Sequence, residues 1–523
     1  MEIPLDKKPL RPGHLLLAIA LFCAFFAASY PYYRYFVDPD AVAYLTMAKR
    51  ATEGDAWRLV NALWSPLHPA LVAVCVRLGV NDVLAMQLTN GLACVLILIA
   101  VYLLFRRFAA GRFAGGVLLA ALAFFLVYAL YKQSFCDLWQ IAILLFYLGL
   151  MTAPDFLRKP GKWLLCAILM AFAAYAKVYS FYFLLLQFPL ALLLIKKPSN
   201  RSRFPLRTYV VVMLLQVLLL SPLVWLQHQK YGGWGLSKSG ALNTSWLLTG
   251  HKTHKRGITA LVPPPYPNSP YTWEDPWLAE GTLHTRFESL KMVKSSAAHV
   301  VLAAAQGVKA SAEISPFLLV VFAGGLLVVL FKSRQRIFGA NYKILLASAV
   351  ILPLGYFLQH FEARYIWLLL PVCMIIGTRM LVAFGSWTGS ERAYRMAVAG
   401  FALSFMAYPV YDLQKLFRAG EDVYREAKLL NSMGITGNFT SNDNPSRSGE
   451  LAYWLNGHYY TPTRTGLGPQ EVLADMRRYG IKYYLSYKGP FDVATPVLQD
   501  EAGRPYPEIS RGRIEGLKVF MVE

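Results

Sequence analysis

The sequence predicts a polytopic α-helical membrane protein that ends in a small α/β domain. Its 523 residues are 56% hydrophobic and only 16% charged, whereas about a quarter of the residues are charged in an ordinary soluble domain. Several apolar runs reach about 18 residues or more, which is the length that a membrane-spanning helix requires. Past residue 414 the long apolar runs give way to short strand-like runs.

The net charge of +22 would suit a nucleic-acid-binding protein, but the positions of the charges argue against one. Lys and Arg gather in short connectors between the apolar runs, at 106–112, 158–162, 196–207 and 332–336. This is the positive-inside pattern, which orients membrane helices and requires no binding partner. No basic face is interleaved with exposed aromatic residues, as a nucleic-acid interface would be.

About eleven membrane spans are predicted from the apolar runs and the basic connectors. They lie near 13–33, 82–105, 114–131, 138–153, 163–176, 178–195, 207–227, 313–331, 343–359, 365–383 and 396–411. The first run has a basic flank and no small-residue cleavage site, so we expect an uncleaved span with a cytoplasmic N-terminus. Eleven crossings of the inner or plasma membrane then leave the C-terminus outside the cytoplasm.

Two connections on the extracytoplasmic side are longer than the others. Residues 34–66 are expected to form a loop with amphipathic helices that lie in the membrane interface. Residues 228–312 are expected to form a long polar loop, rich in Pro, Trp and Tyr, and loops of this length are usually functional or disordered. We assign both loops to a transmembrane module, 1–413.

The last part of the chain, 414–523, is predicted to be a soluble extracytoplasmic α/β domain. Strand-like runs lie at 481–485 and 517–522, and helical stretches lie at 450–455 and 469–479. Such an alternation in about 100 residues is typical of a small α/β fold.

Two carboxylates, Asp38 and Asp40, stand where the chain leaves the first span and meets water. In a structural interpretation, Asp40 caps the helix that begins near Ala41. In a chemical interpretation, a carboxylate here is a general base that takes the proton from an attacking hydroxyl group. The pair would also suit Mg²⁺ or Mn²⁺, which prefer hard oxygen ligands. These interpretations stay open together, because a capping Asp can still act.

Three further charged residues fall on the same predicted side as Asp40. Asp137 begins a span, Lys177 interrupts an apolar junction, and Arg364 opens a late span close to Glu362. Each has a structural interpretation: a membrane-boundary marker, a snorkelling side chain, and an interfacial anchor neutralised by Glu362. Ionisable residues at membrane depth are also functional candidates by default, and Arg binds phosphate in a bidentate manner.

The segment Asp40-Ala41, Tyr44, Ala48-Lys49-Arg50 and Gly54, followed by 65–69 (Ser-Pro-Leu-His-Pro), resembles the first extracytoplasmic loop of GT-C glycosyltransferases. That group includes bacterial arabinosyl-, galacturonosyl- and aminoarabinosyl-transferases and protein O-mannosyltransferases. In these enzymes an acidic residue precedes an aromatic residue and an Ala-Arg or Ala-Lys pair at similar spacing. Matching that Ala to Ala48 places the catalytic Asp of the family on Asp40, with Asp38 as a secondary neighbour.

The resemblance also implies a GT-C fold and roles for other residues. Asp137 looks like the second acidic position of the family, which would position the acceptor or hold a metal. Lys177 and the Arg364-Tyr365 pair look like the groups that bind the donor phosphate. The substrate-binding candidates are Tyr44, His68, Glu362 and Tyr365. For His68, in a Pro-bounded turn, a buried structural histidine is the alternative to a sugar contact.

The predicted function is that of an inverting glycosyltransferase, which moves a sugar from a polyprenyl-phosphate donor to an acceptor hydroxyl. A phosphate is already a good leaving group, so the reaction needs a base and positive charge rather than a strong acid. No G-x-G-x-x-G or Walker pattern suggests a nucleotide donor. The sequence leaves metal dependence open; a divalent cation (Mg²⁺ or Mn²⁺), if one is used, would be held by Asp38, Asp40 and Asp137.

Two other classes of protein were weighed. A transporter or flippase of a lipid-linked or envelope substrate would place its ionisable groups near mid-membrane, often in broken helices, whereas here they gather at one face. A non-glycosyl membrane transferase would want a nucleophilic Ser, Thr or Cys beside a base, usually with a metal cluster, and no such group is visible. The sugar and the acceptor, whether glycan, lipid or protein, are not predicted.

Overall fold

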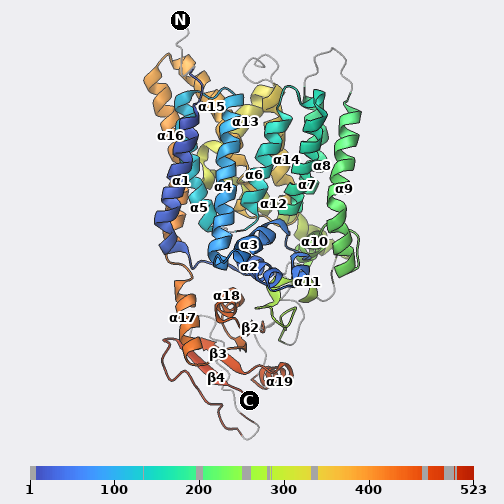
Figure 1. Cartoon of the computed structure of the whole chain (residues 1–523), viewed down its shortest axis with the longest axis vertical. Helices are drawn as coiled ribbons and strands as arrows, with labels where there is room; N and C mark the ends of the chain where they lie inside the picture. Colours follow the sequence, from blue (N-terminus) through green and yellow to red (C-terminus); the bar gives the residue numbers. More distant parts are fainter. Residues whose placement is uncertain are drawn as a thin grey trace.

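A tall bundle of helices makes up most of the molecule, and a small α/β unit lies beneath one end of it (Figure 1). The computed structural model describes residues 8–132, 135–195, 204–249, 261–279, 283, 285–330, 340–461, 469–487, 500 and 503–522. The bundle contains α1 (Pro12–Tyr33), α4 (Asp82–Arg107), α5 (Arg112–Lys132), α6 (Asp137–Met151), α7 (Pro160–Ala176), α8 (Tyr179–Leu194), α9 (Leu206–Tyr231), α12 (Leu290–Ile314), α13 (Pro316–Leu330), α14 (Ala340–Leu358), α15 (Leu369–Thr388) and α16 (Glu391–Lys415).

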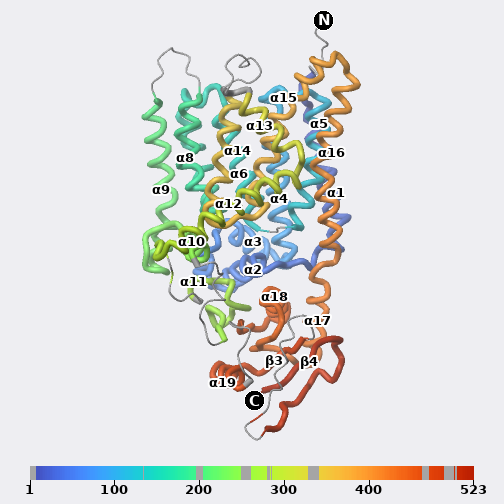
Figure 2. Tube along the Cα trace, turned by 180° about the vertical axis from the view of Figure 1, so that it is seen from behind, coloured from blue at the N-terminus to red at the C-terminus, as the bar shows by residue number. Residues whose placement is uncertain are grey.

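The composition of each helix matches its place in the bundle. The central helices α4 and α5 are apolar on all sides and largely buried. At the edge, α9 turns Leu214 and Leu218 outward, with about two thirds of each side chain exposed. Figure 2 shows α9 and α16 at opposite edges of the bundle. Apolar helices that expose leucine on the outside of a bundle are those of a membrane protein.

Within the described part of the chain, seven helices are long and apolar enough to cross a membrane. The pair α12 and α13, bent by 111°, raises the number to eight if it forms one broken span. The prediction of about eleven spans therefore counts three helices, α6, α7 and α8, that have only 15 to 17 residues. These helices are short because α6 begins, α7 ends and α8 begins around a cavity that is described below.

The short helices α2 (Pro39–Thr52) and α3 (Leu67–Arg77) lie across the lower end of the bundle (Figure 1). The prediction placed the amphipathic helices of this region in the membrane interface, but α2 is enclosed by protein. Residues Ala41 to Ala48 are all buried. They pack against α3, the 3₁₀ turn η4 (Thr272–Glu274) and a helix of the α/β unit.

The predicted bounds of the polar loop, 228–312, are partly wrong. Helix α9 continues to Tyr231, and α12 begins at Leu290, so the connection is shorter at both ends. Lysines near the start of α12 had given that helix the composition of a loop. Between α9 and α12 lie α10 (Ser239–Thr249), η4 and α11 (Pro276–Ala279).

The α/β unit is built on a four-stranded sheet with the order β2-β1-β3-β4. The strands are β1 (Asn438–Ser441), β2 (His458–Tyr459), β3 (Tyr483–Tyr487) and β4 (Leu517–Met521), and the helices are α17 (Glu421–Ser432), α18 (Pro445–Leu455) and α19 (Pro469–Tyr479). β1 pairs in parallel with β2 and β3, and β4 runs antiparallel to β3. The predicted strands and helices of this region are confirmed as β3, β4, α18 and α19.

A tight connection joins the bundle to the α/β unit at Gly420, between α16 and α17. Its φ angle is 78°, and a Cβ at this position would lie 2.3 Å from the carbonyl oxygen of Tyr35. Only glycine adopts this backbone conformation readily and allows such a close approach. On the other side, Tyr453 of α18 donates a hydrogen bond to Asp82 of α4 at 2.7 Å. These two contacts hold the α/β unit against the end of the bundle.

Candidate active site

A cavity of about 460 Å³ lies at the end of the bundle that faces the α/β unit. It is formed by the first turn of α2, the start of α6, the α7–α8 junction, α10 and the 3₁₀ turn η6 (Ala363–Ile366). The charged residues on its wall are the four that the sequence singled out for the centre of the site, Asp40, Asp137, Lys177 and Arg364.

The Asp38-Pro39-Asp40 sequence divides the two carboxylates between two tasks. Asp38 has an extended backbone and Pro39 occupies the first helical position, so Asp38 is the N-cap of α2. Its Oδ1 accepts a hydrogen bond from the backbone N–H of Ala41 at 2.8 Å. The expectation that Asp40 caps this helix was therefore wrong. Asp40 lines the cavity, and Asp38 is not among the lining residues.

Two donors from distant parts of the chain hold the Asp40 carboxylate. The indole N–H of Trp273 donates to Oδ1 at 2.8 Å, and the guanidinium of Arg364 donates to Oδ2 at 2.9 Å. A carboxylate that accepts one fixed donor on each oxygen has a defined orientation. Asp40 itself retains 19% exposure of its side chain, so it is open to a molecule in the cavity.

Asp137 and Lys177 form a second ion pair, whose atoms Oδ1 and Nζ are 2.5 Å apart. Asp137 is the first residue of α6 and is 1% exposed, so a cation beside it offsets the cost of burying its charge. The Nε of Arg364 lies 3.7 Å from Oδ2, the other carboxylate oxygen of Asp137. Arg364 thus lies between Asp40 and Asp137 and connects the two acidic positions.

Aromatic rings surround the two cations. The Lys177 ammonium lies 3.7 Å from the centroid of the Tyr365 ring, and the Arg364 guanidinium lies 4.2 Å from that of Phe135. Tyr365 in turn stacks on Tyr356, with centroids 4.3 Å apart. Such cation–π contacts hold a cation in place without neutralising its charge.

Glu362 lies behind Arg364 and does not line the cavity itself. Its carboxylate pairs with Arg364 at 3.0 Å and contacts the His360 imidazole at 2.9 Å. Burial alone would raise the pKa of Glu362, but Arg364 and His360 outweigh burial and lower this pKa below its ordinary value. Glu362 therefore reaches the cavity through Arg364 and His360, both of which line it.

Tyr44 lines the cavity, but His68 does not. The His68 ring is fully buried and meets the edge of the Tyr44 ring with centroids 5.6 Å apart. The substrate-binding assignment of His68 is corrected on this ground, because the side chain lies beneath Tyr44 and does not reach the cavity. The alternative, a structural histidine, fits its position.

No protein-family model matches the sequence, and no curated protein sequence matches it. Solved structures do resemble it. The structure of ArnT from Cupriavidus metallidurans bound to undecaprenyl phosphate has a TM-score of 0.59 and 13% identity, over 98% of this chain and 98% of that one. The oligosaccharyltransferase of Archaeoglobus fulgidus, in complex with Zn and sulfate, has a TM-score of 0.57 and 11% identity, over 91% of this chain and 68% of that one. The chain has the GT-C fold.

Trp273 contacts the site but is not indicated by the sequence patterns. It lies in η4, inside the connection that was read only as an aromatic-rich loop. A buried ion pair anchors η4, because Arg58 donates to Glu274 at 2.7 Å. The indole of Trp64 also donates to the Trp273 carbonyl oxygen at 3.0 Å. The sequence marks this position only by the triplet Trp-Glu-Asp at 273–275, and no pattern in the sequence indicates that Trp273 contacts Asp40.

A second carboxylate pair lies where the GT-C bundle meets the α/β unit. Burial and the Asp40 carboxylate raise the pKa of Asp38 to about 7. Glu450 of α18 lies close to Asp38, and burial together with the Asp38 carboxylate raises the pKa of Glu450 to about 8. Burial and nearby negative charge both favour the protonated form of a carboxyl group.

The three carboxylates that were candidates for a divalent cation do not fit one in this arrangement. Both oxygens of Asp40 accept hydrogen bonds, Asp38 accepts one from backbone, and Asp137 faces Lys177 and Arg364. Among the described residues, no group of three or more His, Cys, Asp or Glu is placed to hold a metal ion.

Proposed function

We propose that this protein transfers a sugar from a polyprenyl-phosphate donor to an acceptor hydroxyl, with inversion, at the extracytoplasmic face of the membrane. The observation that carries the proposal is the meeting of Asp40, Asp137, Lys177 and Arg364 on one cavity at the end of an apolar bundle. The GT-C fold supports it, since the similar ArnT structure is bound to undecaprenyl phosphate and the other similar structure is an oligosaccharyltransferase.

Asp40 is the proposed general base. The acceptor oxygen bonds to the anomeric carbon while the bond from that carbon to the phosphate oxygen breaks, and Asp40 takes the hydroxyl proton. A single displacement of this kind inverts the configuration at the anomeric carbon. The donors Trp273 and Arg364 orient the carboxylate before the acceptor arrives, which lowers the entropic cost of the reaction.

Lys177 and Arg364 are the proposed stabilisers of the leaving phosphate. An ammonium has three N–H donors and a guanidinium has five. Lys177 can therefore keep its bond to Asp137, and Arg364 its bonds to Asp40 and Glu362, while each donates to a phosphate oxygen in the cavity. Asp137 positions Lys177 through their ion pair. Positive charge already held in a partly buried site stabilises the developing phosphate charge without reorganisation.

The rings of Tyr44 and Tyr365 are the proposed contacts to the sugar or the acceptor, because both line the cavity. Glu362 is assigned an indirect role in substrate binding, since it holds Arg364 and His360 in place. We assign no role to a metal ion.

The proposed orientation rests on the basic connectors at 106–112 and 158–162, which lie at the end of the bundle away from the cavity. Arg107 ends α4, and the other end of that helix meets the α/β unit. The positive-inside rule then places the cavity and the unit outside the cytoplasm. We accordingly propose a catalytic membrane module, 1–413, and an extracytoplasmic domain, 414–523, in a multi-pass protein of the inner or plasma membrane. A lipid-linked sugar and a glycan, lipid or protein acceptor are its proposed partners.

The test uses Asp40→Asn beside the matched control Asp38→Asn, in which Asn still caps α2. A strain that lacks the gene is complemented with each variant or with the unaltered gene, and its envelope lipids and glycans are compared by mass spectrometry. We expect Asp40→Asn to lower transfer by at least about 100-fold, the usual minimum for losing a general base. Asp38→Asn should restore the products.

Near-normal product from Asp40→Asn, with equal amounts of protein in the membrane, would overturn the assignment of the base. A second measurement separates transfer from transport. The purified protein in detergent, given a radiolabelled polyprenyl-phosphate sugar and an envelope extract as acceptor, should release polyprenyl phosphate. A flippase would move such a lipid across a bilayer but would leave it intact.

A further inference from the structure

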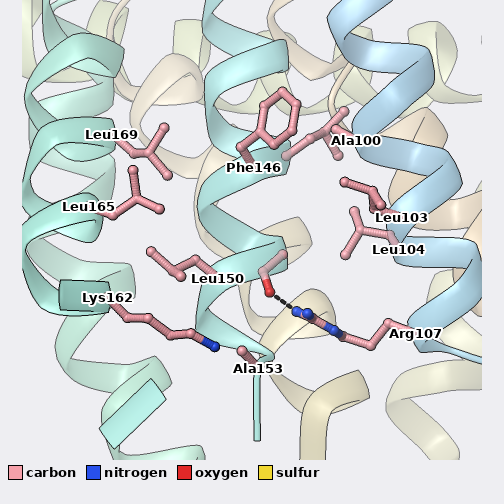
Figure 3. A pocket seen from close by; sticks show the side chains of 12 residues that line it. Ala100, Leu103, Leu104, Arg107, Phe146, Leu150, Ala153, Lys162, Leu165 and Leu169 are labelled. Carbon is pink, nitrogen blue, oxygen red and sulfur yellow. Dashed lines mark hydrogen bonds between the residues drawn. The ribbon is translucent and has the colours of Figure 1, made fainter. Parts of the chain in front are cut away.

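A second cavity lies at the other end of the bundle, away from the α/β unit. Its volume is about 260 Å³, and its walls belong to α4, α6 and α7. Figure 3 shows its two charged residues, Arg107 and Lys162, at one end and side chains of leucine and Phe146 beyond them. The cavity shares no residue with the candidate active site.

The two side walls are built alike. On α4 the lining residues Ala100, Leu103, Leu104 and Arg107 follow the helical repeat, so they share one face. On α7 the residues Lys162, Leu165 and Leu169 do the same. In both helices the cation comes at the connector end, and apolar residues continue for about two turns, roughly 10 Å. The walls therefore enclose a groove that is charged at one end and apolar along its length.

Two small residues, Gly149 in the last turn of α6 and Ala153 just after its end, leave space at the charged end of this groove. A Cβ on Gly149 would meet its nearest neighbour, Leu104 Cδ2, only at 3.9 Å. At the rim, Leu103 and Leu165 are 49% and 46% exposed. The groove thus opens sideways, between two helices whose outer surfaces face the bilayer.

Positive charge exceeds negative charge at the basic end. The Arg107 guanidinium donates to the Gly149 carbonyl oxygen and to Thr152 Oγ1. Lys162 pairs with Asp155, and Lys159 pairs with the same carboxylate at 3.0 Å. Three cations therefore share one acidic partner among the groups that these contacts join. The negative charge of a phosphate group would offset part of this excess and still leave these bonds in place, because each cation has several N–H donors.

We propose that this groove binds an anionic phospholipid of the cytoplasmic leaflet. Its headgroup phosphate would accept hydrogen bonds from Arg107 and Lys162, and one acyl chain would lie between the leucines of α4 and α7. Basic pockets between membrane helices on this side are suited to anionic headgroups. A soluble anion would leave the apolar length of the groove empty, whereas a phospholipid matches both its parts. This inference does not rest on the proposed sugar transfer.

The test reconstitutes the full-length protein in nanodiscs of equal parts phosphatidylcholine and phosphatidylglycerol and identifies retained lipids by native mass spectrometry. The unaltered chain should retain phosphatidylglycerol in preference. The double variant Arg107→Gln/Lys162→Gln should lose that preference by about fivefold for each basic side chain removed. Gly149→Leu should lower retention of both lipids, since its side chain fills the groove, and leucine is a better helix former than glycine.

The matched control is Arg106→Gln, an exposed neighbour that does not line the groove and should retain the preference. Equal retention of the two lipids by the unaltered chain would overturn the proposal, and so would unchanged retention in either groove variant. Undecaprenyl phosphate is added in equal amount to test whether a polyprenyl phosphate occupies the groove in place of a phospholipid. If it displaces phosphatidylglycerol, the groove binds a phosphate monoester of a polyprenol, and the proposal is wrong.

Discussion

Trp273 donates its indole N–H to Oδ1 of Asp40 at 2.8 Å and so joins two residues that are 233 positions apart in the chain. The bond connects η4, in the long connection after α9, to the first turn of α2. Because Arg364 donates to the other oxygen, the carboxylate is fixed from the loop on one side and from the bundle on the other. The proposed base therefore depends on a loop residue for its orientation.

The first prediction concerns this bond. Trp273→Phe keeps an aromatic ring but removes the N–H, and a hydrogen bond to a charged group contributes about 1.5–3 kcal/mol. We expect kcat for sugar transfer to fall roughly 10- to 100-fold, with KM for the donor nearly unchanged, since the bond orients the base rather than the lipid. Steady-state kinetics of the purified protein measure both constants.

The control for this variant is Trp277→Phe, four residues further on, where the ring lies near Lys238 rather than near Asp40. It should leave kcat within about twofold, as surface changes away from a site usually do. A rise in KM for Trp273→Phe with kcat unchanged would mean that Trp273 binds substrate and does not position Asp40.

The second prediction concerns the Lys177–Asp137 pair. Lys177→Met leaves the Asp137 carboxylate buried with only Arg364 nearby, and breaking a buried pair in this way costs about 3–5 kcal/mol. The double variant Lys177→Met/Asp137→Asn removes both charges and should regain most of the lost thermal stability. It should not regain full sugar transfer, because one of the two cations proposed for the leaving phosphate is still missing. Thermal unfolding in detergent and donor turnover are measured on the same samples.

Lys159→Met is the comparison, since its ion pair with Asp155 is largely exposed and such pairs contribute only about 0–1 kcal/mol. Full activity in the double variant would show that Lys177 serves the fold alone.

Sequence patterns were enough to predict the membrane bundle and most of the α/β unit. Long apolar runs determine where helices lie, and the last two strands were predicted from the short strand-like runs at 481–485 and 517–522, close to their observed bounds. β1 was missed because its four residues, Asn438–Ser441, are short and mostly polar, and parallel pairing with β2 and β3 stabilises them. The start of α12 was missed for a related reason, since its lysines hid the helical repeat.

The charged centre of the site was predicted from position in the chain together with the resemblance to GT-C glycosyltransferases. Asp40, Asp137, Lys177 and Arg364 each end or begin an apolar run on one predicted side, and the structure brings them to one cavity. The expectation that Asp40 caps α2 was wrong. Pro39 occupies the first helical position, so Asp38, the residue before it, is the N-cap. Trp273 could not be predicted, since its bond to Asp40 depends on tertiary packing of a loop.

The third prediction concerns pH and the carboxylates of Asp38 and Glu450. Burial, together with nearby negative charge, raises the pKa of Asp38 to about 7 and that of Glu450 to about 8. These two carboxyl groups therefore bind more protons in the folded chain than in the unfolded chain between about pH 4 and pH 8, and their contribution to the free energy of unfolding falls as pH rises through this range. Glu450→Gln removes one of the two titrating groups. We expect the unaltered protein to lose several degrees of Tm between about pH 5 and pH 8, and the variant to lose clearly less.

The control is Glu391→Gln, at an exposed carboxylate that pairs with Arg395. It should keep the full slope of Tm against pH. A slope in Glu450→Gln equal to that of the unaltered protein would mean that Glu450 is ionised throughout this range, and that the contact between α18 and α2 does not depend on its protonation.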